Sequence, residues 1–241
     1  MEENAILTEN LTKKFNNGLV AVAEVNLKIR TGEIYALMGE NGAGKTTLIK
    51  ILTGLMLPTS GRADIFGRDI VKSPTAAKKM FGFVSDNPTA YDYLTGQEFL
   101  YFTGSLREIP EKELKEKMEK LSGLFPIKEV LSQKMGSYSR GNRQKVAFLA
   151  SLLDNPKLLL IDEPIAGLDP TSIEIFGQSL REFRSNGGAV LFVTHILSFA
   201  QNYATNYGFM KNGRILEEGT IDQNTDLKLK YEQTTKHENH S

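Results

Sequence analysis

The segment Gly39–Thr46 constrains the fold of this chain more than any other part of the sequence. It reads Gly-Glu-Asn-Gly-Ala-Gly-Lys-Thr and fits the phosphate-binding pattern G-x-x-x-x-G-K-[ST] at every fixed position. The apolar run Ile34–Met38 comes directly before it. The residues after it repeat with the period of one helical face, at Leu48, Ile51, Leu52 and Leu55. The sequence therefore predicts a buried strand, a glycine-rich turn and a helix seated on a sheet.

This arrangement predicts an anion-binding site suited to a nucleoside triphosphate. Backbone N–H groups of the turn converge with the N-terminus of the helix on one pocket. Lys45 is expected to reach the β- and γ-phosphates, and Thr46 is expected to bind Mg²⁺. The residues expected to surround the nucleotide phosphates are Gly39, Asn41, Gly42, Ala43, Gly44, Lys45, Thr46 and Thr47.

Composition excludes several classes of function. Lysine plus arginine and aspartate plus glutamate both number 29, so no excess of positive charge favours nucleic acid, and we expect no nucleic-acid partner. The apolar runs are far shorter than the ~20 residues that cross a bilayer, and Met1–Asn4 lacks the basic start of a signal peptide. We expect a soluble globular chain in the cytoplasm, with any membrane role coming through a partner. The absence of cysteine fits that compartment.

The two ends of the chain predict a sheet. Residues 5–38 show strand-like alternation with a turn at Asn16–Gly18. Leu158–Ile161 and Ala189–Thr194 are continuous apolar runs, typical of parallel strands covered on both faces. A helix beginning at Asp169 and ending before Gly187 lies between them. This β-α-β order predicts a parallel sheet with right-handed crossovers.

The middle of the chain, about residues 88–155, has helical periodicity and few β-branched residues, so it predicts an inserted helical subdomain. The charged run Glu111–Lys120 carries acid-to-base pairs four residues apart and is interpreted as a solvated helix face without chemistry. Tyr207–Leu216 predicts a hairpin around Asn212–Gly213. Residues 1–221 are expected to form a single domain, and residues 222–241 a polar, flexible tail.

A pair of carboxylates follows the second buried run. Asp162 and Glu163 stand where the strand Leu158–Ile161 ends, and ligands of open α/β sheets collect at the carboxyl ends of strands. Asp162 is expected to hold Mg²⁺ or its waters, and Glu163 to polarise an attacking water. A solvated turn is the alternative reading of an Asp-Glu-Pro sequence taken alone.

These motifs together resemble the nucleotide-binding subunit of an ATP-binding cassette (ABC) transporter over nearly the whole chain. Tyr138–Lys145 stands where the family has its Leu-Ser-Gly-Gly-Gln signature, and Ala166–Asp169 resembles its D-loop. His195 resembles the switch histidine. Phe15 resembles the aromatic residue that stacks on adenine, with Val20 beside it, although a half-buried strand aromatic is an alternative reading of Phe15.

The resemblance implies an α/β P-loop NTPase with a mostly parallel core sheet, an antiparallel β subdomain and an inserted helical subdomain. It implies two subunits arranged head to tail, a homodimer or a heterodimer with another cassette. Ser139 and the N–H groups of Gly141 and Asn142 would then face the ATP of the other subunit, at the start of a helix. His195 would hydrogen-bond the γ-phosphate.

The chain departs from the family pattern at three positions. Asp86 stands where the family has a glutamine that touches Mg²⁺, and direct coordination or contact through water are both open for it. Tyr138 replaces the leucine of the signature, and Arg140 replaces its first glycine. Arg140 is expected to reach either the partner's phosphates or an acidic residue across the interface.

The resulting hypothesis is an ATPase in which Lys45, Glu163 and His195 carry the reaction with Mg²⁺ held by Thr46, Asp162 and Asp86. It would power a separately encoded membrane permease from the cytoplasmic face of the membrane. The acid at the glutamine position and the Tyr-Ser-basic-Gly signature are similar to an ABC-2-type exporter branch, which points to export. A soluble cassette ATPase with a non-transport partner is the alternative. A GTPase or small-molecule kinase lacks support, because no N-K-x-D motif occurs. Nothing in the sequence selects the cargo.

Overall fold

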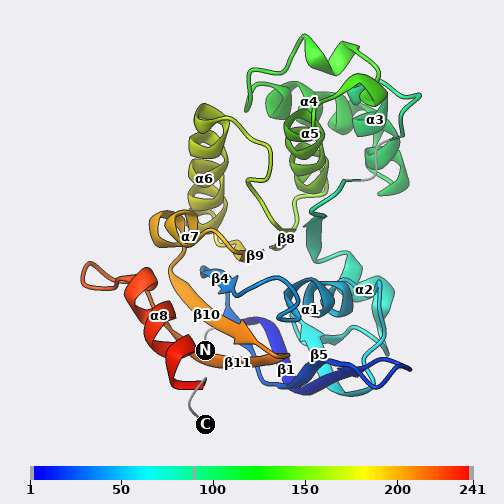
Figure 1. Ribbon diagram of the computed structural model, residues 1–241. Helices are drawn as coiled ribbons and strands as arrows, with labels where there is room; N and C mark the ends of the chain where they lie inside the picture. The colour runs from blue at the N-terminus through cyan, green and yellow to red at the C-terminus, as the bar shows by residue number, and fades with distance from the viewer. Residues whose placement is uncertain (1–2, 89–90, 239–241) are drawn as a thin grey trace.

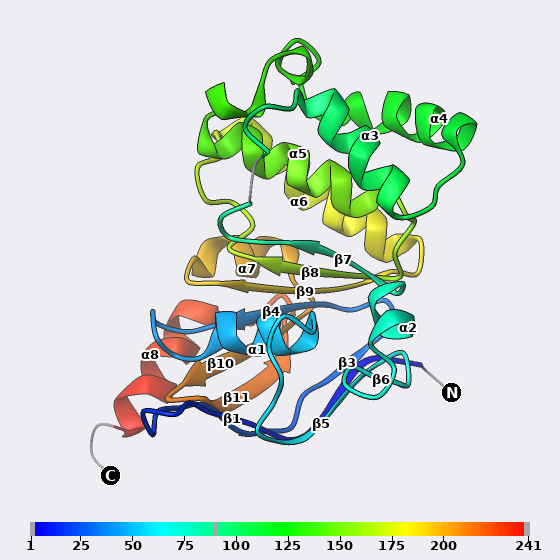
Figure 2. The ribbon, with the colours of Figure 1, turned by 90° about the vertical axis from the view of Figure 1, so that its right-hand side faces the viewer.

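The structure is a computed structural model of the 241-residue chain, and it describes residues 3–88 and 91–238. Two sheets and a group of helices stack in layers. Figure 2 shows the helical layer at the top, a parallel sheet in the middle and an antiparallel sheet at the bottom. The predicted α/β architecture, with its three parts, is confirmed.

The central sheet has six strands in the order β11-β10-β4-β9-β8-β7. Neighbouring strands from β10 to β7 pair in parallel, and β11 pairs antiparallel with β10. Every residue of β4, β8 and β9 is buried, as the continuous apolar runs predict. The strands are β4 (Ile34–Met38), β7 (Phe81–Val84), β8 (Leu158–Asp162), β9 (Ala189–Thr194), β10 (Asn206–Lys211) and β11 (Arg214–Thr220).

The second sheet is antiparallel and runs β2-β1-β5-β6, with β3 paired to β1. Its strands are β1 (Asn4–Lys14), β2 (Val20–Val25), β3 (Lys28–Arg30), β5 (Ser60–Ile65) and β6 (Arg68–Asp69). The turn expected at Asn16–Gly18 separates β1 from β2, and Gly18 N–H donates to the Phe15 carbonyl at 2.9 Å. The short helix α2 (Pro74–Lys78) leads from this sheet to β7.

The helices inserted between β7 and β8 form what we call the helical lobe, residues 96–152. It consists of α3 (Gly96–Leu106), α4 (Glu111–Ser122), the 3-10 turns η1 (Val130–Ser132) and η2 (Met135–Ser137), and α5 (Arg140–Leu152). A capping box at Thr95 and Glu98 starts α3. The charged face of α4 carries the expected ion pairs Glu111–Lys115 and Glu113–Lys117, each at 2.7 Å. Figure 1 shows the lobe standing apart from the antiparallel sheet, on the far side of the central sheet.

Side chains of the central sheet alternate between two hydrophobic cores. Ala36, Ile161 and Phe192 face the core formed with α5, α6 (Pro170–Ser185), α7 (Leu197–Tyr203) and the helical lobe. Leu37 and Leu191 face the core formed with α1 (Lys45–Leu52) and the antiparallel sheet. The central sheet is therefore covered on both faces, and only its edges and strand ends are free to build a site.

Helix α1 is shorter than the predicted apolar stripe. Leu48, Ile51 and Leu52 are fully buried, but Leu55 is 66% exposed. The helix ends because Thr53 caps it and Gly54 adopts a left-handed conformation with φ of +71°. The expected core role of Leu55 is therefore wrong.

The expectation of a flexible tail over residues 222–241 does not hold for residues 222–238, the part that the structure describes. Helix α8 (Leu227–Glu238) packs on the hairpin of β10 and β11. Leu227 is fully buried, and the Tyr231 ring lies 5.2 Å from the Phe209 ring. Lys230 pairs with Glu217 at 3.2 Å. The polar composition of residues 222–241 did not predict these two apolar contacts, which lie one helical turn apart.

Candidate functional site

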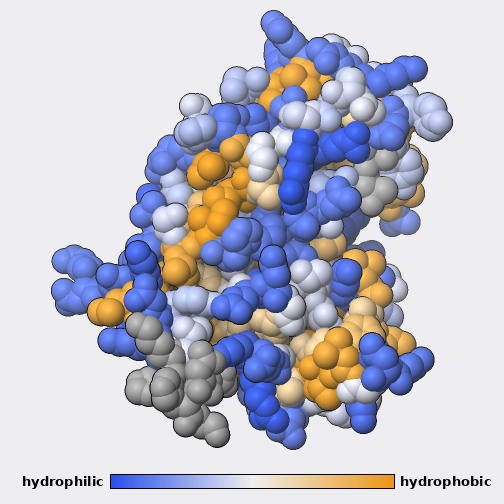
Figure 3. All heavy atoms as spheres, viewed as in Figure 1, coloured by the Kyte–Doolittle hydropathy of each residue, from blue (hydrophilic) through white to orange (hydrophobic). Residues whose placement is uncertain are grey.

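The side chains with expected chemistry come from the ends of three neighbouring strands. Strand β4 leads into the phosphate loop, β8 ends at Asp162, and β9 ends at Thr194. Because β4 pairs with β9 and β9 with β8, all in parallel, these ends lie on one edge of the sheet. Segments more than 100 positions apart in the chain thus meet at that edge, as expected for an open α/β sheet. The surface there is largely hydrophilic in the space-filling view (Figure 3).

The phosphate loop is a close-packed turn in which glycine is required. Gly42 and Gly44 have φ of +86° and +109°, conformations that disfavour other residues. A Cβ on Gly44 would lie 2.1 Å from the Ala21 carbonyl oxygen, and one on Gly39 would lie 2.1 Å from that of Met210. Gly44 also offers no side chain to cap α1. The first N–H groups of α1, on Lys45, Thr46 and Thr47, are therefore left for an anion.

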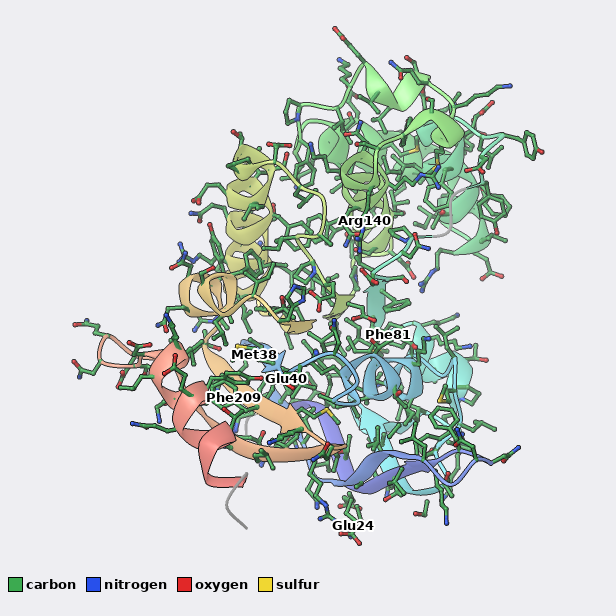
Figure 4. All side chains as sticks on the ribbon, in the orientation of Figure 1. Glu24, Met38, Glu40, Phe81, Arg140 and Phe209 are labelled. Carbon is green, nitrogen blue, oxygen red and sulfur yellow. The ribbon has the colours of Figure 1, made fainter. Side chains whose placement is uncertain are left out.

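Lys45 lies over the loop. Its ammonium donates to the carbonyl oxygens of Gly39 at 2.6 Å and Glu40 at 3.0 Å. Burial lowers the pKa of Lys45, and the charges of Glu163 and Asp162 partly oppose that effect. Figure 4 shows Glu40 just past the end of β4, below Arg140 at the start of α5. These carbonyl oxygens accept hydrogen bonds that phosphate oxygens would accept from Lys45 in a nucleotide complex.

Thr46 and Asp162 face each other from α1 and β8. The hydroxyl of Thr46 donates to Asp162 Oδ1 at 3.3 Å. Burial raises the pKa of Asp162 to about 6, the Thr46 hydrogen bond opposes the rise, and the charges of Asp86 and Glu163 add to it. Asp162 is 4% exposed. A buried carboxylate with two acidic neighbours is an environment in which a divalent cation is stabilising.

Glu163 and His195 form a second pair on the other side of the β8 end. Glu163 leaves the strand with φ of +52°, and its N–H donates to the Val193 carbonyl at 3.0 Å. Its Oε1 lies 2.9 Å from His195 Nδ1, and its Oε2 accepts from the Thr194 hydroxyl at 3.3 Å. Asp162 and Glu163 thus have separate partners, and their expected separate roles toward Mg²⁺ and the attacking water stay predictions. The sequence predicted no role in the site for Thr194, because it is the last residue of an otherwise apolar run.

The segment expected to face a second nucleotide begins α5. Ser139 caps this helix, and its Oγ accepts from the Asn142 N–H at 3.2 Å. That N–H is therefore engaged within the chain in this structure. A Cβ on Gly141 would lie 2.3 Å from the Gly167 carbonyl oxygen. The start of α5 and the segment before α6 are hence in backbone contact, and glycine at position 141 allows it.

An ion pair that sequence reasoning missed supports the same contact. Lys145 is 7% exposed, and its ammonium lies 3.1 Å from Asp169 Oδ2. Asp169 also caps α6 by accepting from the Ser172 N–H at 2.9 Å. Bonds from Ser172 and then from Lys145 hold the pKa of Asp169 well below its usual range. The pairing could not be read from the sequence, because Lys145 and Asp169 are 24 positions apart.

Asp86 and Arg140 lie together. Arg140 Nη2 donates to the Asp86 carbonyl oxygen at 3.3 Å and also contacts its carboxylate. Arg140 stands at the lower end of the helical lobe in Figure 4, above the sheet edge that bears Met38 and Glu40. Arg140 thus has an acidic partner within its own chain, a contact not expected from the sequence, while the expected contact across an interface stays a prediction.

Phe15 and Val20 are on the hairpin between β1 and β2, which borders the phosphate loop through the contact of Ala21 with Gly44. Phe15 is half-buried, with the Lys13 ammonium 5.6 Å from the centre of its ring. Val20 is 40% exposed. Both residues therefore leave apolar surface beside the loop, where a planar base could stack.

The donor set fits a magnesium–nucleotide complex better than a metal alone. Thr46, Asp162 and Asp86 supply hard oxygen atoms, which Mg²⁺ prefers. Among residues 3–88 and 91–238, no cluster of three or more acidic, histidine or cysteine side chains could hold a metal. Mg²⁺ usually takes one or two carboxylates together with substrate phosphates, which this edge provides if the loop holds a triphosphate.

Comparison with known sequences gives a consistent result. The family profile described as ABC transporter matches residues 22–166. The chain is 35% identical over 222 residues to the bacitracin transport ATP-binding protein BcrA of Enterococcus faecalis, covering 92% of this chain and 71% of BcrA.

Solved structures agree in fold. A structure of the ATP-binding subunit of an ABC transporter superposes with a TM-score of 0.89 at 30% identity, covering 96% of this chain and 99% of that one. A dimeric ATP-binding cassette in a post-hydrolysis state, bound to ADP and Pi, superposes with a TM-score of 0.79 at 26% identity, covering 90% and 99%.

Proposed function

This chain belongs to the ABC transporter family, and we propose that it drives export through a separately encoded membrane permease, using ATP hydrolysis by two cassettes that close on each other. It is an ATP-binding subunit and an ATPase of that family. The observation that supports the mechanism best is the convergence of Lys45, Asp162 and Glu163 at one edge of the central sheet.

Lys45 and the N–H groups at the start of α1 bind the phosphates of ATP. When the γ-phosphate arrives, the Lys45 ammonium exchanges the carbonyl oxygens of Gly39 and Glu40 for phosphate oxygens. This exchange places a positive charge where negative charge develops during the reaction. Phe15 and Val20 would contact the base from the β1–β2 hairpin.

Glu163 orients the attacking water and accepts its proton. Its carboxylate is held by the Thr194 hydroxyl and by His195, so it has few rotamers available and keeps a fixed direction. His195 has 58% of its side chain exposed and is placed to move from Glu163 to the γ-phosphate. Mg²⁺, held by Thr46 and Asp162 with Asp86 nearby, would neutralise charge on the phosphates.

A second cassette completes the site in this proposal. The start of α5, with Ser139, Gly141 and Asn142, is a helix N-terminus suited to an anion. In a head-to-tail dimer it would close over the partner's ATP, and the dimeric post-hydrolysis cassette supports that arrangement. Hydrolysis then depends on dimer closure. Two copies of this chain, or this chain with another cassette, both fit.

A membrane partner is supported by an exposed aromatic surface. Tyr91 and Tyr93 are 51% and 88% exposed, and Tyr91 packs edge-on against Phe102, 5.4 Å between ring centres. Exposure at this level favours a partner interface over core packing for both tyrosines. The helical lobe and the loop from Asp86 to Tyr93 are expected to contact this partner, and residues 89 and 90 of that loop lie outside the described residues. None of the helices within 3–88 and 91–238 is long and apolar enough to cross a bilayer.

The permease would place this chain on the cytoplasmic face of the membrane, and transport of bacitracin by the BcrA system supports an export role. The test is affinity capture from detergent-solubilised membranes with tagged Glu163→Gln and Mg-ATP. A stoichiometric polytopic membrane protein is the expected result. Capture of soluble proteins alone, by a variant that dimerises with ATP, would contradict the permease and favour a soluble cassette ATPase.

A further inference from the structure

Two positions at which this chain departs from the family pattern, Asp86 and Arg140, are in contact with each other. Arg140 Nη2 reaches both the carbonyl oxygen and the carboxylate of Asp86, across 54 positions of sequence. Asp86 follows β7 at the edge of the central sheet, and Arg140 is the first residue of α5. The pair therefore connects the sheet to the helical lobe.

Arg140 has contacts along its aliphatic stem as well as at its guanidinium. A Cβ on Gly167 would lie 3.3 Å from Arg140 Cβ and Cγ, so the aliphatic stem packs along the segment before α6. From that base the guanidinium extends to Asp86. The arginine thus bridges the segment before α6, the start of α5 and residues 85–88 after β7, which we call the Asp86 loop.

Each member of the pair has a second possible partner of opposite charge. Val84 of β7 lies opposite Ile161 of β8 in the parallel pair, so Asp86 and Asp162 follow neighbouring strand ends, and the charge of Asp86 also adds to the rise in the pKa of Asp162. Arg140 stands beside Ser139 and Gly141 at the anion-binding start of α5, where a guanidinium can hold phosphate oxygens. While the two residues are paired, neither the carboxylate nor the guanidinium is fully available to these ligands.

We propose that the Asp86–Arg140 pair positions the Asp86 loop in the nucleotide-free subunit and must open when Mg-ATP binds. When the pair opens, the Asp86 carboxylate can turn toward the Mg²⁺ held by Thr46 and Asp162. The Arg140 guanidinium is then free to bind the phosphates of the second cassette's nucleotide. The inference rests on the proposed function. The two departures from the family pattern then act together, because Arg140 competes with Mg²⁺ for the carboxylate of Asp86.

The Asp86–Arg140 ion pair is weak enough for Mg²⁺ to replace Arg140 as the partner of Asp86. The side chains are 54% and 46% exposed, and pairs at this exposure contribute a factor of about two to five in an equilibrium constant. Such a pair can order a loop and still give way to a divalent cation. A fully buried pair would resist opening, because each separated charge would lose its partner without regaining water.

The experiment measures how strongly Mg²⁺ tightens the binding of β,γ-imido-ATP, a non-hydrolysable analogue, to the full chain. The quantity is the ratio of the Kd in EDTA to the Kd in Mg²⁺, at protein concentrations where gel filtration shows a monomer. Four proteins are compared: wild type, Arg140→Gln, Asp86→Asn and the double variant. Arg143→Gln is the matched control, because Arg143 is also a cation of α5 but contacts Asp92 at 3.5 Å, in the helical lobe's own entry loop.

Arg140→Gln is expected to raise the Mg²⁺ ratio about two- to five-fold, because the competing cation is gone. Asp86→Asn is expected to lower the ratio, and in that background Arg140→Gln should have no effect. Arg143→Gln should leave the ratio at the wild-type value.

An Arg140→Gln ratio equal to wild type, or an increase that persists in the Asp86→Asn background, would overturn the inference while leaving the proposed function intact. Failure of the wild-type chain to bind the analogue at all would instead overturn the proposed function and this inference with it. Circular dichroism of each variant confirms that the chains compared are folded.

Discussion

Replacing Asp162 with asparagine should stabilise this protein, although it removes a residue of the proposed site. Asp162 is 4% exposed, and its ionised form is disfavoured mainly by burial. Its pKa of about 6 in the folded chain compares with 3.8 as the ordinary value. That difference corresponds to about 3 kcal/mol of destabilisation once the group is ionised in both states. Asparagine keeps an oxygen acceptor for Thr46 without the charge.

The sign of the pH dependence follows from proton linkage. Because the folded pKa of this acid is raised, the folded state binds more protons than the unfolded state between pH 3.8 and about 6. Stability of the wild type therefore falls as pH rises through that window, and the full cost is present above it. Linkage gives Asp162→Asn a gain of about 1.6 kcal/mol at pH 5 and about 3 kcal/mol at pH 8.

The assay is urea unfolding followed by circular dichroism, at several pH values from 5 to 8, without nucleotide or Mg²⁺. Glu119→Gln, on the exposed face of α4, is the control with the same change of charge and should be neutral within about 0.5 kcal/mol. An Asp162→Asn gain that is equal at pH 5 and pH 8, or a loss of stability at pH 8, would refute the reasoning. The same variant should bind Mg-ATP more weakly, because the cation loses a carboxylate.

Three further perturbations test other parts of the molecule. Glu163→Gln should keep ATP binding and lower single-turnover hydrolysis by about 10²–10⁴-fold, since a general base is lost; an unchanged rate would contradict the role of Glu163. Gly141→Ala places a Cβ 2.3 Å from the Gly167 carbonyl oxygen, so ATP should still bind but the dimer should fail to form in gel filtration, whereas Gly123→Ala, with its nearest atom at 3.5 Å, should behave as wild type. Leu227→Ala should cost about 2–5 kcal/mol in urea unfolding; a neutral result would mean that the start of α8 does not pack into the core.

Local rules explain how much of the site the sequence predicted. Glycine at positions 42 and 44 is required by positive φ, and the helix that follows needs an uncapped N-terminus to bind an anion. Both requirements are met within a few residues, so the pattern Gly39–Thr46 carries them in full. The buried strands and the cap of α6 by Asp169 were predictable for the same reason.

Other features depend on side chains that meet only after the sheet and the helical lobe assemble. The contact of Arg140 with Asp86, and that of Lys145 with Asp169, join residues 54 and 24 positions apart. No periodicity marks such pairs. The packing of α8 was missed because two apolar contacts carry it, and a short polar segment does not reveal which surface will cover it.

The sequence by itself determined the phosphate loop, the order of strands and helices along the chain, and the types of side chain that we propose for catalysis, because each depends on neighbouring residues. The tertiary structure alone decided which carboxylate faces which partner. The chain turns at the end of β8, where Glu163 has a positive φ. Asp162 therefore faces Thr46, and Glu163 faces His195. It also decided the raised pKa of Asp162, since that shift comes from burial and from Asp86 across the sheet edge. Charge interactions depend on distance through space, and the order of residues in a chain does not fix that distance.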